Sequence, residues 1–241
     1  MFRFILVVIT LFLYLILGIP VLGIEWIISK FNADYQCLRM VQAAFRFMLK
    51  IAGTEITVIG EERIPDEPVL FIGNHRSYFD ILLTYSRCKR RTGYIAKKEM
   101  MSYPLLRTWM KRLYCLFLDR DNPKEGLKTI LKAIEYVKSG ISICIFPEGT
   151  RNTGEELSVL PFHSGSFKIA EKSGCPIIPI SMNNTISIFE KQFPRIKKTH
   201  VIIEYGKPIY AKDLDREQKK QLSQNCQKII EDTIKKNQAL L

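Results

Sequence analysis

The sequence predicts an α/β fold, in which a mostly parallel sheet is flanked by helices and preceded by an N-terminal helical segment that is membrane-embedded or membrane-interfacial. Short apolar runs rich in β-branched residues alternate with longer segments whose apolar residues recur at helical spacing. Polar clusters follow two of these runs, where open α/β sheets bind their ligands. With 241 residues and 47% hydrophobic content, the chain suits one globular domain with a membrane-facing appendage.

Residues 4–24 carry no charge, and Arg3 and Glu25 stand on either side of them. A stretch of this length is enough to cross a hydrocarbon core of about 30 Å. It is too long for a typical cleaved signal, and no clean small-x-small site follows it. Pro20 and the glycines at 18 and 23 would kink its second half, so a helix that enters one leaflet and bends back stays open beside a spanning one. We expect a membrane anchor in either case.

A second helix is predicted at residues 34–52, where Leu38, Val41, Phe45 and Leu49 recur at helical spacing with cations between them. This pattern suits a helix in a membrane interface. It suits equally a helix that packs on the core of its own domain.

The globular domain begins at residues 54–59, which alternate like an edge strand, and the turn-rich residues 61–68 separate them from a short buried strand at 69–72. Residues 79–83 indicate the start of a helix. The remaining predicted elements are strands at 93–96, 114–118, 141–146, 176–182 and 201–205, helices at 103–112, 124–139, 165–173 and 213–236, and a polar loop at 152–160. Strands and helices in alternation favour a largely parallel sheet.

The polar cluster Gly73 to Asp80 directly follows the strand at 69–72. If Ser77 caps the helix that begins after it, His75 and Asp80 lie on either side of one tight turn. The carboxylate then bonds one imidazole nitrogen and leaves the other as a base. The H-x4-D spacing alone is weak, because a histidine near an aspartate is more often a capping or surface residue. The cluster Phe146 to Arg151 strengthens it, because it brings a turn, a carboxylate and a guanidinium to the same edge of the sheet.

Two further motifs complete a set of four blocks in a fixed order: Asn74-His75-x4-Asp80; Lys97-Lys98-Glu99 with Pro104 and Asp119-Arg120; Phe146 to Arg151; and Pro176-Ile177-Ile178-Pro179-Ile180. In order and separation they resemble the glycerolipid acyltransferases, whose best-known members are 1-acylglycerol-3-phosphate (lysophosphatidate) acyltransferases. The resemblance covers about residues 70–210. Together with the two N-terminal helical segments, it gives membrane-associated helices in residues 1–52 and an acyltransferase catalytic domain in residues 53–241.

The resemblance also implies the reaction. A fatty acyl group would pass from acyl-CoA or acyl-carrier protein to the free hydroxyl of 1-acylglycerol-3-phosphate, giving phosphatidate in phospholipid biosynthesis. The acyl donor is a co-substrate, and we expect no cofactor. Another lysophospholipid acceptor is the first alternative, and a basic membrane-binding protein without chemistry is the second.

Acyl transfer from a thioester to an alcohol needs a base, an orienter for that base, and cations for anionic substrates. His75 could take the hydroxyl proton, and Asp80 would hold its tautomer and stabilise the imidazolium, as in a serine-protease triad. Because the substrate hydroxyl is the nucleophile, Ser77 is expected to be a cap. The fork of Arg151 suits phosphate, and the resemblance implies that role for it. Gly149 would let the backbone approach a ligand.

The remaining site residues come from the resemblance. Glu148 would either bind the glycerol part or fix its loop, and the plainer alternative is a loop carboxylate paired with Arg151. Lys97 would add charge for the phosphate, Asn74 would orient the turn, and Thr150 belongs to the same block as Glu148. One position departs from the family: His163 stands where many members carry lysine, in Phe-Lys-x-Gly. This substitution leaves the acceptor headgroup open.

The net charge is +12, and residues 87–112 hold nine Lys or Arg and one acid, Glu99. Such a segment suits anionic lipids, substrate phosphates or nucleic acid, or is a solvated face. The apolar N-terminus and the sparse aromatic residues among these cations weigh against nucleic acid.

The six cysteines form no C-x-x-C pair, which favours reduced thiols and an active site that faces the cytoplasm. No two histidines lie at ligand spacing, so we expect no metal.

Overall fold

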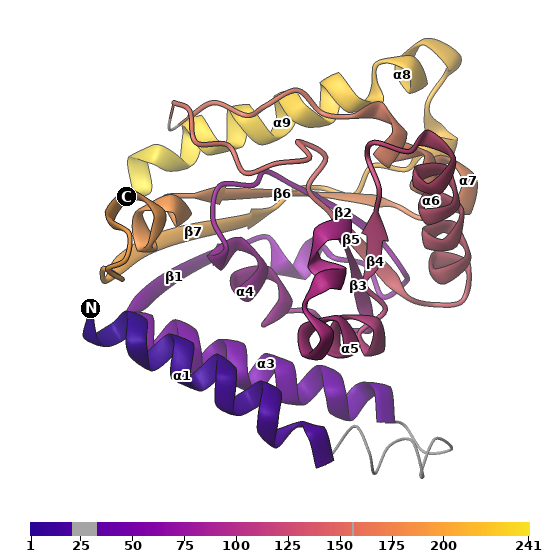
Figure 1. Cartoon of the computed structure of the whole chain (residues 1–241). Coiled ribbons are helices and arrows are strands. Elements are labelled where there is room, and N and C mark those ends of the chain that lie inside the picture. The colour runs from indigo at the N-terminus through magenta and orange to yellow at the C-terminus, as the bar shows by residue number, and fades with distance from the viewer. Residues whose placement is uncertain (21–32, 156) are drawn as a thin grey trace.

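A twisted sheet with helices on both faces organises the computed structural model, which describes residues 1–20, 33–155 and 157–241 (Figure 1). In the described part, seven strands lie in the order β1-β7-β6-β2-β5-β3-β4. They are β1 Thr54–Ile59, β2 Leu70–Gly73, β3 Thr92–Lys97, β4 Leu116–Leu118, β5 Ser142–Ile145, β6 Ile177–Asn183 and β7 Thr199–Tyr205. The α/β class, the mostly parallel sheet and the edge position of β1 are confirmed.

The pairings between these seven strands are parallel except that of β6 with β7, where Ser181 lies opposite Glu204. Short 3-10 turns at Thr185–Ile188 and Glu190–Gln192 join these two strands, and no crossover helix lies between them. A connection without a crossover returns the chain antiparallel to itself. The strand order places β2 in the middle, with β5 and β6 on either side.

Two helical layers cover the sheet (Figure 1). One holds α1 Phe2–Leu17, α3 Ala33–Ala52, α4 Phe79–Tyr85 and α5 Pro104–Arg112, and the other holds α6 Pro123–Lys138, α7 Lys168–Ser173, α8 Arg216–Lys220 and α9 Leu222–Asn237. Alternate residues of β2 serve the two layers: Phe71 faces the first, and Leu70 and Ile72 face the second. The central strands are therefore buried on both faces, which explains their continuous apolar runs.

Burial shows that the apolar stripe of the second helix packs on the core of its own domain. In α3, Leu38, Val41 and Leu49 are at most 4% exposed and belong to the core cluster of the first layer. The helix therefore packs on its own domain.

Helix α1 lies alongside α3 and presents two different sides (Figure 1). Phe4, Val7 and Leu15 pack against the core, and the other side exposes large apolar side chains. The helix ends at Gly18, where an added Cβ would lie 2.1 Å from Cζ2 of Trp109 in α5, so only glycine permits this close contact. Of the charge-free run, residues 21–24 lie outside the described residues. Among the helices of the described residues, none is both long enough and apolar enough to span a bilayer.

The C-terminal segment differs from the prediction of one helix over 213–236, because the chain forms α8 and α9 with a break at Gln221. A capping box between Asp215 and Gln218 starts α8, which buries none of its residues. Helix α9 buries Cys226 and Ile230 against the second layer. The break lets α9 follow the sheet while α8 stays in solvent.

Candidate active site

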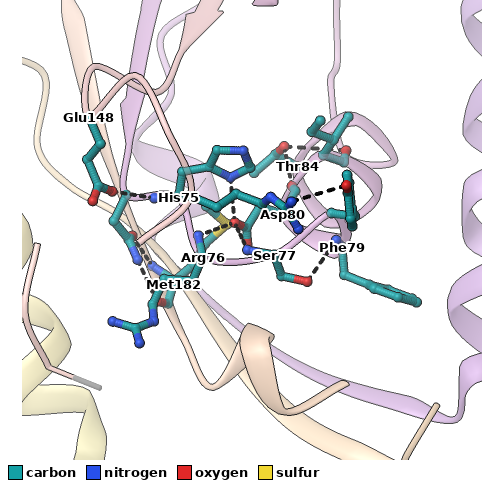
Figure 2. A network of polar contacts seen from close by, with 12 residues as sticks. His75, Arg76, Ser77, Phe79, Asp80, Thr84, Glu148 and Met182 are labelled. Carbon is teal, nitrogen blue, oxygen red and sulfur yellow. Dashed lines mark hydrogen bonds and ion pairs between the residues drawn. The ribbon is translucent and has the colours of Figure 1, made fainter. Parts of the chain in front are cut away.

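The turn between β2 and α4 converges on one oxygen of Asp80, a residue that is fully buried (Figure 2). Its Oδ2 accepts hydrogen bonds from Nδ1 of His75 at 2.8 Å and from the backbone N–H groups of Arg76 and Ser77 at 2.7 Å each. A carboxylate only accepts, so Nδ1 of His75 carries the proton and Nε2 is left as an acceptor. The structure thus brings together the two residues that the H-x4-D spacing predicted to meet.

The imidazole of His75 is also fixed by stacking on the ring of Phe146, with centroids 4.4 Å apart and planes 13° apart. Phe146 directly follows β5, which pairs with β2. Gly73 leaves room for this ring, since an added Cβ there would lie 3.0 Å from it. The imidazole is therefore held by a hydrogen bond to Asp80 after β2 and by stacking on Phe146 after β5. The side chain remains 16% exposed, which leaves it accessible to a substrate.

Glu148 fixes the loop after β5. Its two carboxylate oxygens accept from the backbone N–H groups of His75 and Leu160, and the N–H of Asn152 donates to the carbonyl of His75 at 2.7 Å. Burial raises the pKa of Glu148 to about 7, although the two N–H donors act in the opposite direction. Of the alternatives left open by the sequence, the geometry matches a loop-fixing carboxylate and not a partner of Arg151.

Asn74 orients the turn from the other side. Its side-chain amide donates to the carbonyl of Met182 at 3.0 Å and accepts from the N–H of Met182 at 2.8 Å, which ties the turn to β6. Ser77 was expected to cap the helix, but the N-cap position of α4 is Tyr78. The hydroxyl of Ser77 still accepts from the N–H of Phe79 at 3.0 Å. The carboxylate of Asp80 accepts from the N–H groups of Arg76 and Ser77, which precede α4, so it fixes the turn and does not cap the helix.

Arg151 reaches the same turn through Tyr78. Its guanidinium lies 3.7 Å from the centroid of the Tyr78 ring, Nη2 donates to the Tyr78 hydroxyl at 3.1 Å, and Nη1 lies 3.4 Å from Oε1 of Glu190. The side chain is 33% exposed. Cation and aromatic ring together form a flat, partly open surface beside the turn between β2 and α4.

Gly149 has φ +75°, a conformation that favours glycine, and an added Cβ would lie 3.3 Å from both Nη1 of Arg120 and Nε2 of His163. These two side chains therefore approach the backbone of the turn. Arg120 is exposed, and partial desolvation of its guanidinium lowers its pKa from the ordinary value. Thr150 is exposed beside Gly149.

Lys97 ends β3, the strand next to β5, and its side chain is exposed. Within the described ranges, no hydrogen bond or ion pair joins it to the other predicted site residues. The neighbouring Lys98 is also exposed, and its Nζ lies 2.6 Å from the carboxylate of Asp119. Lys97 thus lies at the correct end of the sheet but outside the bonded cluster.

Three residues of the site were not predicted as such: Arg76, Tyr78 and Glu190. The buried guanidinium of Arg76 donates to the carbonyls of Gly154 and Glu155, which straps the loop 152–160 over the turn. Arg76 and Tyr78 lie inside the first block, so their position was a usable signal. Glu190 had no local signal, since its contact with Tyr78 spans 112 residues of sequence.

A cavity of about 190 Å³ lies on the same face of the sheet, toward the opposite ends of the strands. Its walls include Phe71, Ile180 and Tyr94, and Arg87 and Lys89 contribute cations to its lining. The ring of Tyr94 lies 6.4 Å from that of Phe146, on which His75 stacks. Tyr94 therefore lies between the cavity and the ring of Phe146 that packs on His75.

Comparison with known proteins gives concordant matches. The family model described as Acyltransferase matches residues 55–183. Enzymes named 1-acyl-sn-glycerol-3-phosphate acyltransferase from Saccharomyces cerevisiae and Cocos nucifera are 29% and 34% identical over 79% and 71% of this chain. The matched chain spans only 63% and 55% of those two relatives. The relative from Escherichia coli is 30% identical over 68% of this chain and 66% of its own length.

The fold is also that of a solved structure. The crystal structure of the 1-acyl-sn-glycerophosphate (LPA) acyltransferase from Thermotoga maritima superposes with a TM-score of 0.80 at 21% identity, covering 98% of this chain and 95% of that one. At this identity the likeness shows the fold alone.

Proposed function

The chain belongs to the acyltransferase family, and on that premise we propose that it transfers a fatty acyl group from acyl-CoA or acyl-carrier protein to the free hydroxyl of 1-acylglycerol-3-phosphate, giving phosphatidate. The observation that carries the proposal is the bond between Nδ1 of His75 and the buried carboxylate of Asp80, which leaves Nε2 as a base. The relatives from Saccharomyces cerevisiae and Escherichia coli carry this activity in their names.

In the proposed reaction, Nε2 of His75 takes the proton of the acceptor hydroxyl while its oxygen attacks the thioester carbonyl. Collapse of the tetrahedral intermediate forms the ester and expels the thiolate of the donor, which receives the proton from the imidazolium. Asp80 stabilises that imidazolium, and its two backbone donors keep the carboxylate oriented. The acceptor supplies the nucleophile, so no acyl-enzyme is formed and no cofactor is needed.

We assign phosphate recognition to a group of side chains that we call the cationic rim: Arg120 and His163, which approach the Gly149 turn, Arg151, which follows it, and Lys97 at the end of β3, the strand next to β5. Arg151 is the main member, because its fork is partly exposed and lies beside the catalytic turn. His163 supports a second candidate, another lysophospholipid acceptor, because an imidazole and not a permanent cation approaches Gly149.

The cavity next to Tyr94 suits the acyl tail of one substrate along the part of its wall that is aromatic and aliphatic, which includes Phe71, Tyr94 and Ile180. This assignment predicts a limit on chain length that a series of acyl donors would reveal.

Membrane association is proposed from α1. Its outward side exposes Phe2, Ile5, Ile9 and Phe12, each at 46% or more, beside further large apolar residues. An apolar face of this size suits the boundary between headgroups and acyl chains, with the active site toward the cytoplasm. Salt screens the binding of a basic patch but does not weaken an apolar contact. If α1 is the anchor, the full-length protein should therefore stay with membranes at high salt. Release by salt without detergent would contradict the apolar anchor.

The activity itself is tested with purified protein, labelled oleoyl-CoA or acyl-carrier protein, and a panel of lysophospholipids. We expect the acyl group to appear in phosphatidate with 1-acylglycerol-3-phosphate as the preferred acceptor. Preference for another headgroup supports the second candidate. No transfer from either donor to any acceptor overturns both and leaves a basic membrane-binding protein without chemistry.

A further inference from the structure

The carboxylate of Glu190 collects three donors, two of which come from the catalytic turn. Oε2 accepts from the hydroxyl of Ser77 at 2.8 Å, and Oε1 accepts from the backbone N–H of Tyr78 at 2.8 Å. Nη1 of Arg151 approaches Oε1 at 3.4 Å. Glu190 lies in the segment after β6, and its side chain is only 14% exposed. The partners of this carboxylate are therefore groups of the protein and not bulk solvent.

Glu190 and Asp80 hold the same turn through different atoms. Asp80 takes the backbone N–H groups of residues 76 and 77, and Glu190 takes the N–H of residue 78 and the hydroxyl of Ser77. Between them, the two carboxylates satisfy three successive backbone donors just before α4. Hydrogen bonds to charged acceptors are the stronger class, so losing either carboxylate should loosen the turn that positions His75.

The contact with Arg151 gives Glu190 a second role. The guanidinium is stacked on Tyr78 and bonded to the Tyr78 hydroxyl, while Tyr78 is itself held by Glu190 through its N–H. One carboxylate therefore connects the catalytic turn with the cation to which we assign the phosphate. The distance of 3.4 Å and the partial exposure of Arg151 make this pair weaker than the two bonds to the turn.

Aromatic rings connect Glu190 to the N-terminal helix. The neighbouring Phe189 stacks on Phe4 of α1, with centroids 5.4 Å apart and planes 12° apart. Phe189 also lies 6.5 Å from the ring of Phe79, the first residue of α4, and 5.3 Å from that of Phe193. The segment that presents Glu190 thus rests between α1 and the catalytic turn.

We propose that Glu190 is a positioning residue that keeps the turn of His75 and the guanidinium of Arg151 in one frame, and that α1 supports it through the stack of Phe4 on Phe189. This inference rests on the acyl-transfer function proposed above. It predicts that kcat depends on the bonds of Glu190 to the turn, and that the KM of the phosphate-bearing acceptor depends on its contact with Arg151. It also gives α1 a part in catalysis besides membrane binding.

The test compares Glu190→Gln with Glu190→Ala. In Glu190→Gln the amide oxygen can accept from the N–H of Tyr78 and the amide nitrogen can donate to Ser77, so the turn is kept while the charge beside Arg151 is lost. We expect kcat within about threefold of wild type and an acceptor KM raised about fivefold, with the KM of the acyl donor unchanged. Glu190→Ala loses both the hydrogen bonds to the turn and the charge beside Arg151, so kcat should also fall at least about tenfold.

Two results overturn the assignment: wild-type kinetics in Glu190→Ala, or a kcat in Glu190→Gln as low as in Glu190→Ala. Circular dichroism and thermal melting report folding, and if the alanine variant does not fold, the split between kcat and KM in Glu190→Gln remains the test. Transfer by the wild-type enzyme in the same assay distinguishes a failure of the proposed function from a failure of the role proposed for Glu190. No wild-type transfer contradicts the proposed function, whereas wild-type transfer with indifferent Glu190 variants contradicts only this inference.

The support from α1 is tested with Phe4→Ala against Leu15→Ala in detergent micelles, where membrane binding does not limit the rate. Both changes remove an apolar side chain of α1 that packs on the same core, and of the two only Phe4 stacks on Phe189. We expect kcat to fall severalfold in Phe4→Ala and to stay near wild type in Leu15→Ala. Equal kcat values in the two variants overturn the link between α1 and Glu190.

Discussion

The turn after β2 and the cationic rim lie at the same end of the sheet, yet they are held in different ways. In the turn, Asn74 and Asp80 are at most 1% exposed, and their side chains are bonded to backbone groups. In the rim, Lys97, Arg120 and His163 are exposed, and Arg151 is held by the side chains of Tyr78 and Glu190. Buried groups with fixed partners keep one geometry, whereas exposed cations keep donors available for a ligand.

In the proposed reaction, this difference indicates how the turn and the rim divide catalysis and substrate binding between them. A base must meet the substrate hydroxyl at hydrogen-bond distance every time, so the turn is built from bonds that do not change. A phosphate arrives and leaves with each turnover, so the rim must exchange water for phosphate at small cost. Changes in the turn should therefore appear in kcat, and changes in the rim should appear in the KM of the acceptor.

The largest effect is expected for His75→Ala. Loss of general-base catalysis should lower kcat by about 10²- to 10⁴-fold, and binding of the acceptor should change little. Folding and membrane association should remain, because the ring is partly exposed and lies beyond the end of the strand. Initial-rate assays with labelled donor measure kcat, and a melting curve controls for folding. An unchanged kcat with a raised KM would place His75 in the rim.

Glu148 makes the turn sensitive to pH. Burial raises the pKa of Glu148 from 4.5 to about 7 in the folded chain, so the folded state holds the proton more tightly. The stabilising contribution of this proton is complete below about pH 4.5 and is lost as pH rises through about 7, with a total of up to about 3 kcal/mol. Denaturant titrations between pH 4 and 8 should show this loss in wild type and not in Glu148→Gln. Parallel curves for the two proteins would contradict it.

In the rim, Arg151→Ala should raise the KM of a phosphate-bearing acceptor by an amount worth about 2–3 kcal/mol for one charge-assisted contact. The KM of the acyl donor should change much less. Arg151→Lys should recover little, because a single ammonium cannot replace the fork. Equal damage to both substrates would point to a folding role through Tyr78.

The smallest effect is expected for His163→Lys. A permanent cation beside Gly149 should lower the KM for the lysophosphatidate acceptor severalfold and leave kcat unchanged, because His163 approaches the backbone of Gly149. No hydrogen bond joins it to His75 among the residues that the structure describes. The comparison of acceptors with and without a terminal phosphate monoester measures the effect. A change in kcat instead of KM would break the division between turn and rim.

Much of the turn was predictable because it is local. His75 and Asp80 are five residues apart, so one strand end and one helix start decide whether they meet. That the cluster from Phe146 to Arg151 lies near His75 followed from the rule that parallel strands end at the same edge of a sheet. Glu190 could not be predicted, because its place depends on β6 lying beside β2, and strand order is not written in local patterns.

Packing explains the other differences. The spacing in α3 is the same whether the apolar side meets a membrane or a core, so the sequence left both alternatives open. The contact of Gly18 with Trp109 joins residues far apart in the chain, and no sequence motif announces it. Helix α9 begins at Leu222, where the buried apolar residues also begin, whereas the polar residues of α8 before it stay unburied.

The most direct measurement of whether the turn acts as one catalytic unit is the kcat of His75→Ala, Asp80→Asn and the double variant under identical conditions. If Asp80 works through the imidazole, the double variant should be scarcely slower than His75→Ala, because its partner is already gone. If the two losses multiply, Asp80 contributes independently of His75, and a base held by this carboxylate is not the mechanism.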